Sequence, residues 1–284
     1  MDGPSKGKDT VLPRGARPLD HGVVGAGRFW ELDLLRGSAL LIMIVFHLGF
    51  DLYYFGGHDI DVHAGFWPYL SQGGAAIFIM LVGVSLSLTF SKSEAVGRPF
   101  TVYARRNLLR GLVIFGLGMC ISLATWLALA SGHVVFGVLH LIGISIIISI
   151  PFMKLGKWNL PIGAGLIALG FHVGTMGNGA YWLLWTGIKP ANFTSVDYFP
   201  ILPWFGLVIL GVFIGDVLYP MRVRRFHIPD IRNFVPVKNV SFIGRHSLAV
   251  YLAHQPIIIV LLHMAGVINL WSKISVQLPR LPFY

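Results

Sequence analysis

Two ionisable residues, His47 and Asp51, stand inside an apolar run that otherwise suits lipid, and they are the strongest candidates for chemistry in this sequence. They are four residues apart, so in a helix they share one face. Arg36 precedes His47 by eleven residues, which at about 100° per residue returns it to within about 20° of that face, roughly 16 Å away. A carboxylate can orient an imidazole and raise its basicity. The spacing therefore predicts a general base, His47, that is oriented by Asp51 and aligned with a cation.

Further polar residues occur within or beside other apolar segments. Ionisable groups inside a bilayer are costly, so each of them is a functional candidate. The candidates on the side of His47 are His63, His140, Asp197, His254 and Gln255, and those on the opposite side are Arg106 and Arg110. Each also has a structural interpretation. The arginines can extend to lipid headgroups, the histidines can be hydrogen-bonded packing residues, and His254 can cap a backbone group freed by Pro256.

The composition indicates an integral membrane protein. Charged residues make up 12% of the 284 residues, about half the fraction found in soluble domains. Apolar runs of about 20 residues mark membrane-spanning helices, and the strict alternation of a barrel strand is not seen. We therefore predict an all-α, polytopic membrane helix bundle with about seven spans. Their ranges are 33–55, 69–91, 107–130, 134–153, 159–175, 200–219 and 242–265.

The basic residues give this bundle a direction. Lys and Arg gather in the N-terminal segment and in alternate loops, among them Arg28, Lys92, Arg98, Lys154 and Arg224. The positive-inside rule then predicts a cytoplasmic N-terminus and an outer C-terminus, in the plasma membrane. This placement accounts for the net charge of +10 without nucleic acid as a partner. We expect a mobile cytoplasmic tail over 1–28, a membrane domain over 29–268 and a short outer tail over 269–284.

Four separated motifs resemble one known family. They read ELDLLRGSALLIMIVFHLGFDLYYFGG, FGVLHLIGISIII, YFPILPWFGLVILGVFIGD and IGRHSLAVYLAHQPIII. In this order, over most of residues 29–265, they resemble the prokaryotic DUF1624 proteins. Those proteins are grouped with the catalytic domain of heparan-alpha-glucosaminide N-acetyltransferase, within the transmembrane acyltransferase superfamily. The first motif also resembles the first helix of the acyltransferase-3 branch, which has an Arg, ten residues and a His, here Arg36 and His47.

The resemblance implies an enzyme that moves an acyl group from cytoplasmic acyl-CoA to an acceptor on the far side of the membrane. By this resemblance His47 is the catalytic base and Arg36 belongs to the acyl-CoA site. We expect Arg106 and Arg110 to meet phosphates of the same ligand, because guanidinium groups match phosphate geometry. The expected co-substrate is acetyl-CoA or another acyl-CoA, and no metal is expected.

The outer half of the bundle is expected to take the acceptor, a glycan or a lipid-linked molecule with a hydroxyl or amine. It would arrive past His63 and Asp197. The remaining candidates, His140, His254 and Gln255, would supply oxyanion donors or bind the acceptor. The lysosomal branch of the family has Asn where His47 stands and its active-site His in the following loop, where the nearest counterpart is His63.

Two other classes of protein also use intramembrane histidines. A proton-coupled transporter or receptor would use the line of His47 and Asp51 as a proton relay. A b-type cytochrome would bind haem through histidines on different helices. The arginine cluster and the four motifs favour the acyltransferase. Because the chain is shorter than the better-known members, a homo-oligomer in membrane lipid is one way to complete an acyl-CoA cavity.

Overall fold

The computed structural model describes residues 28–62, 64–129, 132–177 and 179–268, so His63 and nearly all of both predicted tails lie outside the described residues. The longer helices are α1 (Trp30–Tyr54), α2 (Phe66–Ala95), α3 (Phe100–Ala128), α4 (Val138–Ile148), α5 (Asn159–Gly174), α6 (Ile201–Leu218), α7 (Val235–Arg245) and α8 (Ser247–Met264). Short 3₁₀ helices lie between them, namely η1 (Ile150–Lys154), η2 (Gly156–Trp158), η3 (Tyr181–Thr186) and η4 (Pro220–Arg222). The described chain is thus all-helical, as predicted.

Five of the described helices are long and apolar enough to cross a membrane: α1, α2, α3, α6 and α8. The predicted spans 134–153 and 159–175 correspond to α4 and α5, which have only 11 and 16 residues. Helix α4 ends at Ile148 because Pro151 follows, and proline cannot continue the hydrogen-bond ladder of a helix. The count of seven spans and the orientation of the termini stay predictions.

The last predicted span, 242–265, is wrong at its beginning. Helix α7 ends at Arg245, His246 leaves helical geometry, and α8 begins only at Ser247. Hydropathy did not reveal α7 because the helix is apolar on one face only. The residues that it buries lie along one face: Val237, Ser241 and Gly244.

Close contact between helices through glycine holds the bundle together. A Cβ on Gly83 of α2 would clash with the carbonyl oxygen of Val208 in α6, and Gly211 of α6 makes the reverse contact with α2. Gly37 of α1 and Gly244 of α7 form the same kind of contact. Small residues let helix backbones approach in a membrane, where lipid removes the hydrophobic drive for helix association.

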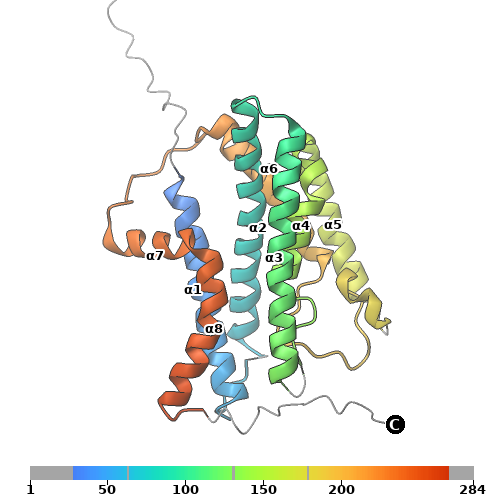
Figure 1. Cartoon of the computed structure of the whole chain (residues 1–284), viewed down its shortest axis with the longest axis vertical. Coiled ribbons are helices and arrows are strands. Elements are labelled where there is room, and N and C mark those ends of the chain that lie inside the picture. Colours follow the sequence, from blue (N-terminus) through green and yellow to red (C-terminus); the bar gives the residue numbers. More distant parts are fainter. Residues whose placement is uncertain (1–27, 63, 130–131, 178, 269–284) are drawn as a thin grey trace, which may run out of the picture.

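Figure 1 shows how the helices are arranged around α2. Helices α3, α4 and α5 lie on one side of α2, and α1, α7 and α8 lie on the other, while α6 packs against both α2 and α5. The core between α2, α4 and α6 is apolar and includes Ile79, Leu141 and Ile209. Because α1 contacts α2, α7 and α8, three helices hold its polar stripe in place.

Candidate functional site

A cavity of about 430 Å³ opens where α1 begins, α2 ends and α3 begins. We call it the basic cavity, because six of its lining residues are cations: Arg28, Arg36, Lys92, Arg98, Arg106 and Arg222. Asp33 is the acidic residue of the lining. A cavity with this charge suits a ligand that carries several negative charges, phosphates above all.

Two side chains fix Arg36 in the basic cavity. Its Nη1 donates to Asp33 Oδ1 at 3.1 Å, the pairing within one turn that their spacing allows, and its Nη2 donates to Ser85 Oγ at 2.6 Å. Ser85 Oγ donates in turn to the carbonyl oxygen of Leu81, also at 2.6 Å. A guanidinium held in this way points into the protein, so extension to lipid headgroups does not explain Arg36.

The other two arginines expected beside Arg36 have different positions. Arg106 lines the basic cavity, whereas Arg110 is not part of its lining. Arg110 lies one turn further along α3 and is exposed. The sequence did not indicate that the remaining cations line this cavity, because they lie in segments between the apolar runs and were interpreted only through the positive-inside rule. They are Arg28, Lys92, Arg98 and Arg222.

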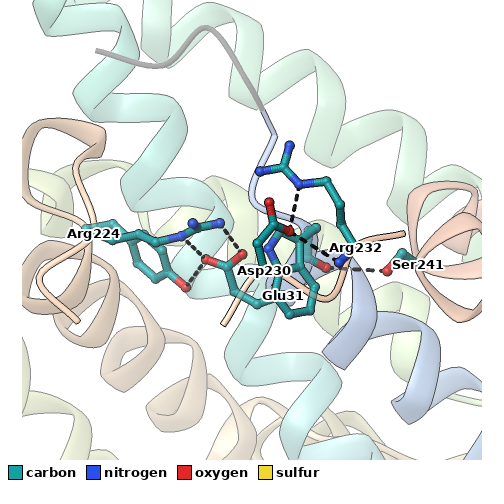
Figure 2. A network of polar contacts seen from close by, with 7 residues as sticks. Glu31, Arg224, Asp230, Arg232 and Ser241 are labelled. Atoms are coloured by element: carbon teal, nitrogen blue, oxygen red, sulfur yellow. Dashed lines mark hydrogen bonds and ion pairs between the residues drawn. The ribbon is translucent and has the colours of Figure 1, made fainter. Parts of the chain in front are cut away.

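The polar network in Figure 2 holds the beginning of α1, which forms one wall of the basic cavity. Glu31 accepts two hydrogen bonds from Arg224, at 2.7 and 2.6 Å, and a third from the Tyr219 hydroxyl at 3.1 Å. Ser241 of α7 donates to the carbonyl oxygen of Trp30 at 3.5 Å. These contacts join α1 to the chain after α6 and to α7, so they set the position of this wall.

A second cavity, of about 800 Å³, lies further along α1. We call it the aromatic cavity, because rings such as Phe46, Phe78, Trp204 and Tyr251 form much of its lining. Polar side chains stand among them, including His47, Gln72, Lys189 and Asp197. Aromatic faces with a few placed polar groups are typical of sites for small molecules.

His47 lines the aromatic cavity, and its own helix orients it. Nδ1 lies 2.9 Å from the carbonyl oxygen of Met43. Because a carbonyl oxygen can only accept, Nδ1 carries the proton and Nε2 keeps the lone pair of a base. The sequence predicted that Asp51 would orient His47, but the carbonyl oxygen of Met43 accepts the hydrogen bond from Nδ1 instead. The Asp51 carboxylate instead accepts two hydrogen bonds from the Gln255 amide of α8, at 2.8 and 3.0 Å.

Helix α8 brings a second histidine against the stripe of α1. The ring of His254 lies 5.0 Å from that of His47, centroid to centroid. His254 Nδ1 donates to the carbonyl oxygen of Tyr251 at 2.5 Å, so the neutral ring has no N–H left on Nε2. In this form His254 cannot be the oxyanion donor that the sequence suggested.

Asp197 also lines the aromatic cavity. Its Oδ2 accepts the backbone N–H of Val138, the first residue of α4, at 3.1 Å and the hydroxyl of Tyr251 at 3.4 Å. Burial raises the pKa of Asp197 to about 6. Tyr251 was missed at the level of sequence, because a tyrosine in a membrane helix is ordinary and only the fold shows that it links Asp197 to α8.

His140 lies in the packed core and lines neither cavity. It is only 2% exposed, and its ring contacts those of Phe115 and Phe136 at centroid distances of 5.2 and 5.5 Å. Nδ1 accepts the backbone N–H of Gly137 at 3.2 Å, so its proton is on Nε2, the opposite tautomer to His47. This placement favours the packing interpretation of His140.

These features define a class: an integral membrane protein in which a basic cavity and a histidine-containing cavity adjoin the same apolar helix, α1. The family model of the catalytic region of heparan-alpha-glucosaminide N-acetyltransferase matches residues 28–256, and the chain belongs to this family of membrane acetyltransferases. The match confirms the family that the four motifs indicated. No curated protein and no solved structure matches the chain.

Proposed function

We propose that this protein transfers an acetyl or other short acyl group from acyl-CoA to an acceptor on the far side of the plasma membrane, with His47 as general base. The acceptor supplies a hydroxyl or an amine, and a glycan or a lipid-linked glycan is the class that the family suggests. The observation that carries the proposal is the pair of cavities on α1. Transfer from a CoA thioester needs a site for a polyanion and a base on the same path.

The basic cavity supports the donor half of this reaction. The nucleotide end of CoA carries a diphosphate and a 3′-phosphate, and arginine binds such groups through charge and paired hydrogen bonds. Arg36 and His47 lie roughly 16 Å apart along α1, a distance of the order of an extended pantetheine arm. A thioester bound from the basic cavity would therefore extend toward the aromatic cavity. In the predicted topology the basic cavity is cytoplasmic, where acyl-CoA is found.

The aromatic cavity supports the acceptor half. Its rings suit the apolar faces of sugars, and Gln72, Lys189 and Asp197 offer hydrogen bonds to hydroxyls. His47 Nε2 removes the proton of the attacking hydroxyl or amine. The new C–O or C–N bond forms as the C–S bond breaks, and the proton ends on the sulfur of CoA. Direct transfer needs no acyl-enzyme.

Binding of acetyl-CoA can be tested without knowledge of the acceptor, by thermal unfolding of the full chain in detergent with and without acetyl-CoA. Acetyl-CoA at about 100 times its Kd should stabilise the wild type by about 2.7 kcal/mol. Arg36→Ala should lose most of this stabilisation, whereas His47→Ala should keep it. Arg232→Ala is the matched control, because Arg232 is an exposed arginine bonded to Asp230 and is not part of either cavity lining.

Two results would overturn the proposal. Stabilisation that is absent in the wild type, or equal in wild type and Arg36→Ala, would remove the basic cavity as the acyl-CoA site and favour a proton-coupled transporter. A Soret band in the absorbance spectrum of the same sample would identify a haem protein and end the acyl-transfer mechanism.

A further inference from the structure

A second imidazole lies beside the candidate base. The ring centroids of His47 and His254 are 5.0 Å apart, with the ring planes at 78°. His47 lines the aromatic cavity, whereas His254 lies behind it and is only 8% exposed. One turn further along α1, the hydrogen bonds from Gln255 to Asp51 keep the two helices in register. The contact between the two rings is thus part of a fixed interface between α1 and α8.

Hydrogen bonds to carbonyl oxygens set the tautomer of both rings. His47 Nδ1 donates to Met43 and His254 Nδ1 donates to Tyr251. Each neutral ring therefore keeps an unprotonated Nε2. The Nε2 of His254 is buried and has no hydrogen-bond partner among the described residues. This lone pair therefore has no donor to satisfy it in the described part of the chain, and the neighbouring ring of His47 is a group from which it can take a proton.

The surroundings of the two neutral rings favour the binding of one proton to the pair and disfavour the binding of two. On α1 the nearest such group is Asp51, and on α8 it is Tyr251, whose hydroxyl leads to Asp197. Lys189 lies on the wall of the aromatic cavity that the chain before α6 forms. Two imidazolium rings 5.0 Å apart in apolar surroundings would repel each other strongly, so one charge excludes a second.

We propose that His47 and His254 form a one-proton pair, in which either imidazole holds the proton that leaves the acceptor while the other stays neutral. The role in catalysis rests on the proposed function. His47 Nε2 takes the proton as the acceptor oxygen or nitrogen attacks the thioester carbon. The pair holds this proton while the C–S bond breaks and then delivers it to the CoA thiolate. One proton enters and one leaves per acyl group, so no further reactant is needed. His254 acts through His47 and is a positioning residue.

Nitrogen-15 NMR of the full chain in detergent, labelled at histidine, tests the pair directly. Spectra over a range of pH distinguish protonated from unprotonated ring nitrogens, and single-histidine variants assign the signals. At high pH we expect Nδ1–H for His47 and His254 and Nε2–H for His140. On acidification His47 and His254 should change over the same pH range and share one proton, and the second proton should enter about one pH unit lower or more.

The variant His254→Phe keeps a ring of similar size and removes both nitrogens. The midpoint pH of His47 should then fall by about 0.3 unit or more, because one of two positions for the proton is gone. His140→Phe is the matched control, a buried histidine against aromatic rings that should leave both signals unchanged. If His254→Phe does not fold, the coupled titration of the wild type decides alone.

Independent titration of His47 and His254 in the wild type would overturn the pair, as would a His47 midpoint that His254→Phe does not move. Neither measurement uses acyl-CoA. Coupled titration in a protein that acetyl-CoA fails to stabilise would therefore refute the proposed function and leave the proton pair standing, whereas the reverse result would refute the pair alone.

Discussion

Helix α1 meets α7 and α8 through opposite kinds of contact. The first half approaches α7 backbone to backbone, through Gly37 and Gly244. The second half meets α8 through polar side chains, the two histidines in one contact and Asp51 with Gln255 in the next. The basic cavity adjoins the first half, and the aromatic cavity with His47 adjoins the second.

Along α1, the contact with α7 therefore has a structural role, whereas the contact with α8 involves the ionisable groups. Contact through glycine fixes the distance between two helices by shape alone and places no titratable group between them. Contact through side chains brings ionisable groups together inside the membrane, and each group then depends on its partner to offset burial. The contact of α1 with α7 is therefore expected to fail when atoms are added, and its contact with α8 when a hydrogen-bond partner is removed.

The largest effect should come from Gly37→Leu. The new side chain would clash with the backbone of Val240 in α7, and a backbone cannot rotate out of the way as a side chain can. We expect a loss of about 3 kcal/mol in the free energy of unfolding, at the upper end for overpacking, together with loss of acetyl-CoA binding at the adjoining basic cavity. Thermal unfolding in detergent with and without acetyl-CoA measures both.

Gly116→Leu is the control for this substitution, because a Cβ at Gly116 of α3 has open space within 4 Å. It should leave stability and acetyl-CoA binding close to the wild type. Equal stability of the two leucine variants would show that glycine contact does not hold the first half of α1.

A smaller loss is expected from Gln255→Leu, which acts on the second half of α1. The fully buried carboxylate of Asp51 would lose both hydrogen bonds that the Gln255 amide donates. We expect a cost of about 1–3 kcal/mol in the free energy of unfolding, with acetyl-CoA binding retained. Chemical or thermal unfolding with and without acetyl-CoA separates the two effects.

A double variant distinguishes a missing partner from poor packing. Asp51→Leu with Gln255→Leu replaces both polar groups, so it should be more stable than Gln255→Leu alone. A double variant that is as unstable as the sum of the two single variants would show that the polar contact between α1 and α8 has no energetic role.

The sequence predicts contacts within a helix far better than contacts between helices. The alignment of Arg36 with His47 depends on the helical period, which is a local property, and each of the two residues lines one of the two cavities. The partner of Asp51 was predicted to be His47 but is Gln255, on a helix some two hundred residues away. Hydropathy identified the long spans and not α7, since an amphipathic helix has a low average hydropathy. Partners across helices depend on packing, and no pattern in one segment encodes them.

The smallest effect should come from the pH dependence of Asp197, which lines the aromatic cavity. Burial raises its pKa from 3.8 to about 6 in the folded protein, so the folded state holds the proton more tightly than the unfolded chain. The stability that this gives is complete below about pH 4 and is lost as the pH rises through about 6. Asp197→Asn removes the ionisation while its amide oxygen can still accept from Val138 and Tyr251.

The wild type should therefore lose about 2–4 °C in Tm relative to Asp197→Asn between pH 5 and pH 8, as measured by thermal unfolding at a series of pH values. Asp230→Asn is the control: hydrogen bonds from Arg232 lower the pKa of the exposed Asp230, so that variant should differ from wild type in pH dependence only under more acidic conditions. A constant difference in Tm between wild type and Asp197→Asn over this range would mean that burial does not raise the pKa of Asp197. In that case the wall of the aromatic cavity would be open to water, and its hydrogen bonds to α4 and α8 would contribute as little as those of an exposed loop.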